Sequence, residues 1–176
     1  GCRVTLLERQ SRVGRKLLAT GNGRCNLTNY NVSPARYHGG SGFCAYALDA
    51  FDVGATLQFF ASLGLLTVAE DSGRVYPMSN MAGSVLDVLR YALERPGIEV
   101  VTGQAVSSVK KTSDGFTVRT ETDTFSAEKL ILAAGGCAGS KVGGVMDGYQ
   151  LAKSLGHHRT QLYPSLVQLK TDPTYP

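Results

Sequence analysis

Residues 14–29, GRKLLATGNGRCNLTN, combine residue types that suit the binding of an anion. Gly21 and Gly23 permit backbone shapes and close approaches that a side chain would prevent. The free N–H groups of such a loop can form a concave anion site, and Lys16 and Arg24 add positive charge beside it. The segment directly follows the strand-like run VTLLE. We therefore expect a loop that brings its backbone close to a negatively charged ligand.

Cys25 and Asn26 follow the glycines of this loop, so we expect them near whatever the loop holds. Basic neighbours can activate a cysteine as a nucleophile. However, the sequence offers no general base to pair with Cys25. A small buried residue beside the ligand is the role that we favour for it.

Glu8 closes the run VTLLE, and Arg9 follows it. An acid at the carboxyl end of the second strand of a dinucleotide-binding unit can accept hydrogen bonds from both ribose hydroxyls of an adenosine. A surface carboxylate is the plainer interpretation of such a residue. Arg9 could stack on adenine or meet phosphate, although a solvated arginine is the usual case.

Residues 131–136, ILAAGG, form the third candidate element. An apolar run that stops on Ala134, Gly135 and Gly136 would let the chain turn sharply under a bound group, because no bulky side chain stands in the way. An ordinary glycine pair after a strand remains the alternative.

No residue is assigned as catalytic. Tyr76, His38 and Cys137 are polar or reactive residues in or beside predicted loops, and each is more simply explained as structural.

The composition limits the class of protein. The chain has 176 residues, of which 43% are hydrophobic and 18% charged, as in soluble globular domains with one core. No apolar run approaches the ~20 residues that span a bilayer, so we expect no membrane contact. The four cysteines stand singly, which argues against a zinc site or a disulfide scaffold and favours a cytoplasmic location.

Positive charge gathers at the front of the chain. Residues 1–36 contain one acid, Glu8, against Arg3, Arg9, Arg12, Arg15, Lys16, Arg24 and Arg36. Such an excess suggests a phosphate-bearing partner, although a solvated basic face is an equally weighted explanation.

The pattern of apolar residues predicts strands alternating with helices. We expect a buried parallel-type strand at residues 3–8, then a helical stretch over 43–64, broken near Asp52 and capped at Gly64. A hairpin should turn at residues 71–73, and an amphipathic helix should cover 81–95, ending at Pro96 and Gly97.

In the second half of the chain, the pattern of apolar and turn residues predicts a small antiparallel sheet, followed by a last strand and a helix. We expect, in order, a strand at 98–102, a hairpin at Asp114 and Gly115 and a buried strand over 129–136. A helix should follow, with Asp147 at its N-cap and Gly156 at its C-cap. We therefore predict an α/β fold with a parallel sheet and a small antiparallel β-meander. A doubly wound domain normally opens with a strand, a glycine-rich turn and a helix, so the chain looks truncated at its front. It also looks truncated at its rear.

Four segments resemble a bacterial flavoprotein family described as NAD(P)/FAD-dependent oxidoreductases, similar to aminoacetone oxidase or to 3-dehydro-bile-acid reductase. They are LLERQSRVGRKLLATGNGRCNLTN, GRVYPMSNMAGSVLDVLR, LILAAGG and DGYQLAKSLGHH. The resemblance implies an FAD/NAD(P)-binding, Rossmann-like three-layer domain over residues 1–163, lacking its first strand, GxGxxG turn and helix. Residues 164–176 would begin a second, inserted domain.

By this resemblance the cofactor is FAD, NAD(P)H is the electron donor and the substrate is a small molecule, with no nucleic acid. Glu8 would bind the adenosine ribose, with Arg9 beside the adenine. The path from pyrophosphate to isoalloxazine would be lined by Lys16, Gly23, Arg24, Cys25 and Asn26. Backbone at Ala105 and Val106 would meet the adenine, while Ala134, Gly135 and Gly136 would turn the chain near the cofactor. Asp147 and Gly148 would open a helix near the flavin.

Two alternatives remain open. A non-catalytic nucleotide or nucleic-acid binding module could use the basic front, although the aromatic residues, 8% of the chain, are not interleaved with Lys and Arg as base-stacking surfaces require. Alternatively, these residues could fold without holding the cofactor by themselves.

Overall fold

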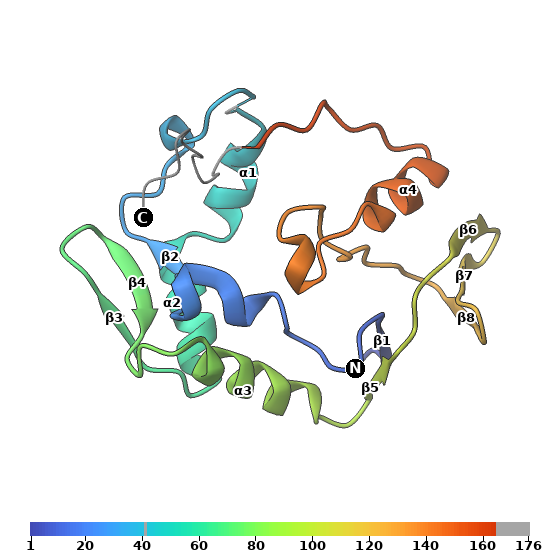
Figure 1. Ribbon diagram of the computed structural model, residues 1–176, viewed down its shortest axis with the longest axis horizontal. Coiled ribbons are helices and arrows are strands. Elements are labelled where there is room, and N and C mark those ends of the chain that lie inside the picture. Colours follow the sequence, from blue (N-terminus) through green and yellow to red (C-terminus); the bar gives the residue numbers. More distant parts are fainter. Residues whose placement is uncertain (41, 165–176) are drawn as a thin grey trace, which may run out of the picture.

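The computed structural model describes residues 1–40 and 42–164. Figure 1 shows two groups of elements, joined by the helix α3 (Ala82–Leu93). The first group contains the strands β1, β5, β6, β7 and β8 with the helix α4, and the second contains β2, β3 and β4 with α1 and α2. The mixture of a parallel pair, antiparallel sheets and helices confirms the predicted α/β class.

The parallel pair is formed by β1 (Val4–Glu8) and β5 (Ile98–Thr102). Val4 lies opposite Ile98, and Glu8 lies opposite Thr102, so both strands end at the same edge of the sheet. The prediction of a buried strand is wrong, because Val4 is 48% exposed and β5 is the only strand beside β1 in the described chain. A strand with a neighbour on one side alone keeps much of its surface in contact with solvent.

The meander contains β6 (Ser108–Thr112), β7 (Gly115–Arg119) and β8 (Thr124–Ala127), paired in that order. The turn at Asp114 and Gly115 is confirmed, whereas β8 was not predicted as a separate strand. Val109 and Val118 on the inner face pack with Leu151 of α4 (Asp147–Ser154). This small core fixes α4 against the meander.

The second core lies between α3, the glycine-rich loop and the second group of elements. Here β4 (Arg74–Pro77) pairs with both β2 (Thr28–Asn29) and β3 (Thr67–Ala69), which confirms the hairpin predicted at residues 71–73. Cys25, Leu65, Ala82 and Val85 are buried together, and Val85 is fully buried. The helix α3 thus packs on the glycine-rich loop through Ala82 and Val85.

The helical stretch over 43–64 is divided as expected into α1 (Gly42–Ala50) and α2 (Val53–Ser62). The Asp52 carboxylate accepts a hydrogen bond from the Ala55 N–H at 2.7 Å, so it caps α2. Gly64 has a φ of +87°, and the N–H groups of Gly64 and Leu65 bond back to Ala61 and Phe60. This pattern is the left-handed helix ending for which glycine is preferred.

Two expectations about the last third of the chain are wrong. Residues 129–136 form no strand, and Ile131 is 89% exposed, because no described strand lies beside this segment to bond with it. In addition, α4 begins at Asp147 itself, after Met146 at the N-cap position, so Asp147 is not the cap. Its side chain instead reaches across to Arg9.

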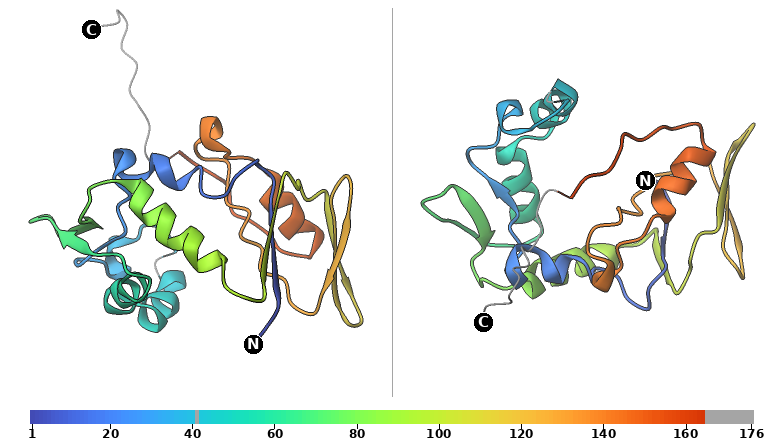
Figure 2. Two further views of the ribbon diagram at one scale, coloured as in Figure 1. Left: turned by 90° about the horizontal axis from the view of Figure 1, so that it is seen from below. Right: turned by 45° about the horizontal axis from the view of Figure 1, so that its top comes forward.

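Short 3-10 segments complete the described chain: η1 (Leu17–Gly23), η2 (Pro34–Arg36) and η3 (Ser140–Val142). The backbone of η1 is interrupted by a non-helical kink at Thr20, Gly21 and Asn22. None of the helices in residues 1–40 and 42–164 is long and apolar enough to cross a bilayer. The predicted second domain at 164–176 lies outside the described residues except for its first position. Figure 2 shows α3 from two further directions, with the meander beyond its C-terminal end.

We expect Asp52→Ala to lower the free energy of unfolding by about 1 kcal/mol, because the substitution removes the N-cap of α2. Urea denaturation followed by circular dichroism measures the change. Asp49→Ala in the exposed surface of α1 is the matched control, with an effect within about 0.5 kcal/mol. Equal losses in the two variants would contradict a capping role.

Candidate cofactor site

The loop after β1 forms a compact turn in which left-handed residues follow one another. Gly21, Asn22, Gly23 and Cys25 have φ values of +54°, +56°, +84° and +60°. A Cβ at Gly21 would come within 2.6 Å of the Asn26 backbone nitrogen, so only glycine allows this turn to close. At Gly23 a Cβ would meet nothing within 4 Å, so one side of the turn is open.

The segment 134–148 forms a second glycine-rich turn against the start of α4. Gly135 has a φ of +69° and nothing near its missing side chain. A Cβ at Gly136 would come within 2.5 Å of the Tyr149 hydroxyl oxygen, and one at Gly148 would come within 2.9 Å of the Gly135 carbonyl oxygen. Gly136 and Gly148 therefore allow the turn and α4 to pack closely.

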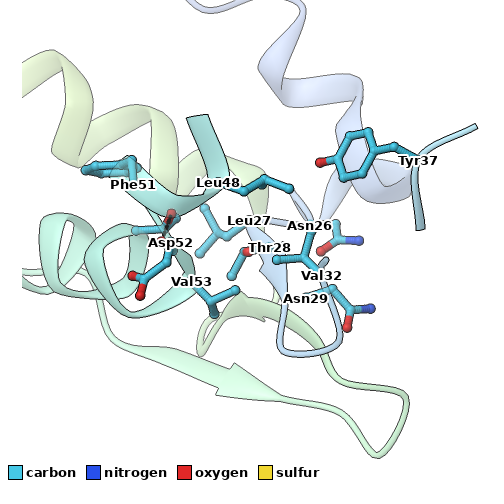
Figure 3. Close-up of a pocket in the computed structure, with 11 residues that line it drawn as sticks. Asn26, Leu27, Thr28, Asn29, Val32, Tyr37, Leu48, Phe51, Asp52 and Val53 are labelled. Carbon is cyan, nitrogen blue, oxygen red and sulfur yellow. Dashed lines mark hydrogen bonds between the residues drawn. The ribbon is translucent and has the colours of Figure 1, made fainter. Parts of the chain in front are cut away.

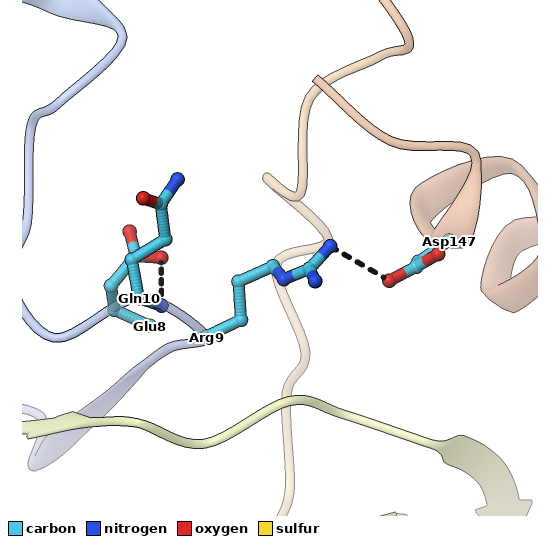
Figure 4. Close-up of polar contacts among 4 residues, drawn as sticks. All are labelled: Glu8, Arg9, Gln10 and Asp147. Atoms are coloured by element: carbon cyan, nitrogen blue, oxygen red, sulfur yellow. Dashed lines mark hydrogen bonds and ion pairs between the residues drawn. The ribbon is translucent and has the colours of Figure 1, made fainter. Parts of the chain in front are cut away.

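Two polar contacts bring the segments together, although they are more than 100 residues apart in sequence. The Arg9 Nη1 lies 3.3 Å from the Asp147 Oδ2, in an ion pair between the end of β1 and the start of α4 (Figure 4). The Lys16 Nζ donates a hydrogen bond of 3.5 Å to the Gly136 carbonyl oxygen. The strand end, the basic loop and the double-glycine turn thus meet in space.

Glu8 is half-buried at the edge of this region. Its Oε1 accepts a hydrogen bond of 2.9 Å from the Gln10 N–H, which holds the carboxylate at the carboxyl end of β1 (Figure 4). Its backbone oxygen accepts another of 2.9 Å from the Gln104 N–H. That bond holds Gln104, and the two residues that follow it, close to Glu8. Ala105 is exposed, whereas Val106 packs against the core between the meander and α4.

Three other predicted site residues, Arg24, Cys25 and Asn26, contact the second group of elements. Arg24 donates to Glu70 at 2.6 Å and to Asn80, and its guanidinium carbon lies 3.8 Å from the centre of the Tyr76 ring. The Arg24 guanidinium therefore already has protein partners. Cys25 is 6% exposed in the core, as expected for a small buried residue, while Asn26 is exposed and lines a pocket.

The residues brought together fit one anionic, elongated ligand. Arg9 and Lys16 are exposed cations, and the open sides of Gly23 and Gly135 leave main chain free to approach a ligand. Glu8 keeps one carboxylate oxygen without a partner in the described chain, as a ribose hydroxyl would require. Cations and main-chain N–H groups of this kind bind anionic groups, and a carboxylate oxygen accepts from a hydroxyl.

Sequence reasoning missed two residues at this site. Gln10 orients Glu8 through its backbone, and Tyr149 places its ring against Gly136. The sequence carries a signal for Tyr149 alone, because it follows the Asp147–Gly148 pair at the start of a predicted helix. Gln10 acts through its main chain, which no residue type reveals.

A parallel strand pair with a glycine-rich loop at its carboxyl edge is a feature of Rossmann-type folds. The chain belongs to the HI0933-like protein Rossmann domain family, which it matches over residues 1–166. This membership confirms the predicted family and fold.

Relatives of known description match the chain over part of their length. The chain is 44% identical over 168 residues to the 3-dehydro-bile acid delta(4,6)-reductase of Clostridium scindens, covering 95% of this chain and 41% of that protein. It is 31% identical over 157 residues to the ribosomal RNA dihydrouridine synthase of Escherichia coli, covering 89% and 39% respectively. The Haemophilus influenzae protein of the same description is 26% identical over 161 residues, covering 89% and 40%. The chain therefore spans about two fifths of the curated relatives that it matches.

We expect Arg24→Lys to lower the free energy of unfolding by about 1 kcal/mol, because a lysine cannot bond to Glu70 and Asn80 together while covering the Tyr76 ring. The pair is partly exposed, at 34% and 38%, which limits the share due to charge alone. Urea denaturation measures the effect. Arg36→Lys, at an exposed arginine with no side-chain partner in the described residues, is the control and should change little.

Proposed function

We propose that this chain is the FAD-binding part of a flavin-dependent oxidoreductase. One observation carries the proposal: Glu8, Arg9, Lys16 and the Gly135–Gly136 turn gather at the carboxyl edge of the parallel strand pair. In open α/β sheets, dinucleotides bind at this edge. The reductase from Clostridium scindens, 44% identical, supports the same class of reaction for the whole protein.

Each residue has a distinct task in this proposal. Glu8 accepts hydrogen bonds from the adenosine ribose with the carboxylate oxygen that Gln10 leaves free. Arg9 lies beside the adenosine, and its ion pair with Asp147 holds the start of α4 against the strand end. Lys16 donates to the pyrophosphate from the position that it now takes at the Gly136 carbonyl.

A bound flavin supplies hydride transfer between NAD(P)H and a small-molecule substrate. The protein contributes position and electrostatics. Cys25 remains a packing residue, because it is buried among Leu65, Ala82 and Val85, with no base within its core cluster. Because Arg9 and Asp147 form an ion pair, Asp147 and the N-terminal end of α4 would lie at the part of the cofactor that Arg9 meets.

A second candidate, reduction of a uridine base in RNA, is favoured by the 31% identity to the Escherichia coli ribosomal RNA dihydrouridine synthase. It shares the flavin site and differs only in the substrate. Affinity for oligonucleotides that falls steeply with added salt would support it.

We expect Glu8→Gln to weaken FAD binding about tenfold and to leave FMN binding unchanged, because FMN lacks the adenosine that Glu8 is proposed to hold. Glutamine still accepts the Gln10 hydrogen bond, so the local fold is retained. Quenching of flavin fluorescence on titration gives both affinities, with Glu99→Gln on β5 as the control.

Equal losses for FAD and FMN would contradict the ribose role of Glu8. Absence of any flavin signal, in both this chain and the longer protein, would contradict the proposed function. Flavin binding by a longer protein that contains this chain, but not by this chain alone, would mean that residues 1–176 do not suffice to bind flavin.

We expect Lys16→Met to weaken FAD binding about tenfold through loss of a charge-assisted hydrogen bond. The remaining affinity should depend less on salt than that of the unchanged protein, since one cation fewer faces the pyrophosphate. The measurement is the FAD affinity at two salt concentrations. Lys111→Met on β6, outside the site, is the matched control.

A further inference from the structure

The stretch between β5 and β6 is held at both ends and free in the middle. Gly103 has a φ of +72°, so the chain turns away from β5 at this glycine. At the other end, the Ser107 N–H donates a hydrogen bond of 2.8 Å to the Arg119 carbonyl. Within the part of the chain that the structure describes, no hydrogen bond uses the main chain of Ala105 or Val106. Because Ala105 is exposed and Val106 half-buried, their free N–H and carbonyl groups can meet a ligand.

Gln104 ties this stretch to two different elements. Its N–H donates a hydrogen bond of 2.9 Å to the Glu8 carbonyl at the end of β1. Its side-chain Nε2 donates to the Asp123 Oδ2 at 3.1 Å and to the Thr122 Oγ1 at 3.4 Å, in the turn between β7 and β8. We call Gln104, Thr122 and Asp123 the Gln104 network. One residue thus links the strand end that carries Glu8 to the meander.

The turn between β7 and β8 presents a fixed acceptor to Gln104. Thr120 is only 9% exposed, and its N–H donates to the Asp123 carbonyl at 2.9 Å. The Thr120 Oγ1 accepts from the Asp123 N–H at 3.0 Å, and the Thr122 hydroxyl donates to the Asp123 Oδ2 at 2.6 Å. These bonds orient the Asp123 carboxylate. A hydrogen bond to such a charged acceptor is stronger than one between neutral groups.

The meander does not need the Gln104 network to fold. Its three strands pair with one another, and Val109 and Val118 pack with Leu151 of α4. Asp123 is exposed, so the bonds of its side chain add little to the stability of the whole domain. What the network adds is local, since it fixes the stretch between β5 and β6 that no strand pairing holds.

The Gln104 network is also separate from the second group of elements. The meander and the helices α1 and α2 lie at opposite ends of the molecule (Figure 1). The pocket between α1, α2 and the segment after Cys25, which Figure 3 shows, is lined by none of the network residues. A substitution in the network therefore tests the β1 and meander side of the molecule alone.

We propose that Gln104 is a positioning residue for the adenosine half of the cofactor. Its bonds to the β7–β8 turn hold the main chain of Ala105 and Val106 beside Glu8 before the ligand arrives. A stretch that is already held loses less entropy when it binds. The inference rests on the proposed function for the identity of the ligand. The holding of the stretch itself needs no flavin, so the two can be tested apart.

The first measurement uses the chain without flavin. Asp123→Ala removes the acceptor of the Gln104 side chain, so the NMR order parameters of the Ala105 and Val106 amides should fall from about 0.85 toward 0.6. Glu121→Ala is the matched control, because it removes an exposed carboxylate from the same turn that has no side-chain bond to Gln104. It should leave these order parameters unchanged.

The second measurement is the affinity for FAD and for FMN, taken on a longer protein that contains this chain if the chain alone binds neither. Asp123→Ala should weaken FAD binding about fivefold and leave FMN binding unchanged, because FMN lacks the adenosine. Gln104→Glu should weaken FAD binding at least as much, since it sets two carboxylates against each other. The double variant Gln104→Glu with Asp123→Asn has the unchanged net charge and restores a hydrogen bond, so it should recover most of the FAD affinity. Glu121→Ala should alter neither affinity.

Circular dichroism of each variant establishes that it is folded before its affinity is compared. Equal losses for FAD and FMN would overturn the proposal, because they indicate a general structural effect. Failure of the double variant to recover FAD binding would also overturn it, as would unchanged FAD affinity in Asp123→Ala, and both results leave the proposed function standing. Absence of flavin binding in every form would contradict the proposed function, and the order parameters would then still decide whether the network holds the stretch.

Discussion

The arrangement of the site depends on close approach between the main chains at Gly135 and Gly148. A Cβ at Gly148 would lie 2.9 Å from the Gly135 carbonyl oxygen, a distance that no side-chain carbon tolerates. Because glycine removes that barrier, α4 can begin directly behind the turn. Asp147 then lies within reach of Arg9, and the Gly136 carbonyl within reach of Lys16.

The glycine-rich loop serves both halves of the molecule. Its first part carries Lys16 toward the turn at Gly136, whereas its end is held by the bonds of Arg24 to Glu70 and Asn80. Cys25 is buried between these points, packed with Val85 of α3. A loop held at both ends keeps its open glycine side in a fixed position, which reduces the entropy lost when a ligand binds.

Much of the fold could be predicted because its signals are local. The cap at Asp52, the left-handed ending at Gly64 and the turn at Asp114–Gly115 depend on residues within a few positions of one another. The apolar run at 129–136 was predicted as a strand and is not one, since a strand needs a partner that the run itself cannot specify. Arg24 shows the same limit, because its bonds to the β3–β4 hairpin and Asn80 involve residues about 50 positions away.

By itself, the sequence determined the class of fold, the family and the glycine-rich basic loop as the place to look, because these features lie in patterns of neighbouring residues. The tertiary structure alone decided which partner each of the charged residues meets. Arg9 pairs with Asp147 and Lys16 bonds to the Gly136 carbonyl, whereas Arg24 bonds to Glu70 and Asn80, and nothing in their residue types separates them. The physical reason is that a cation of the same chemistry can meet a ligand or a protein carboxylate, and only the packing of distant segments determines which partner is near.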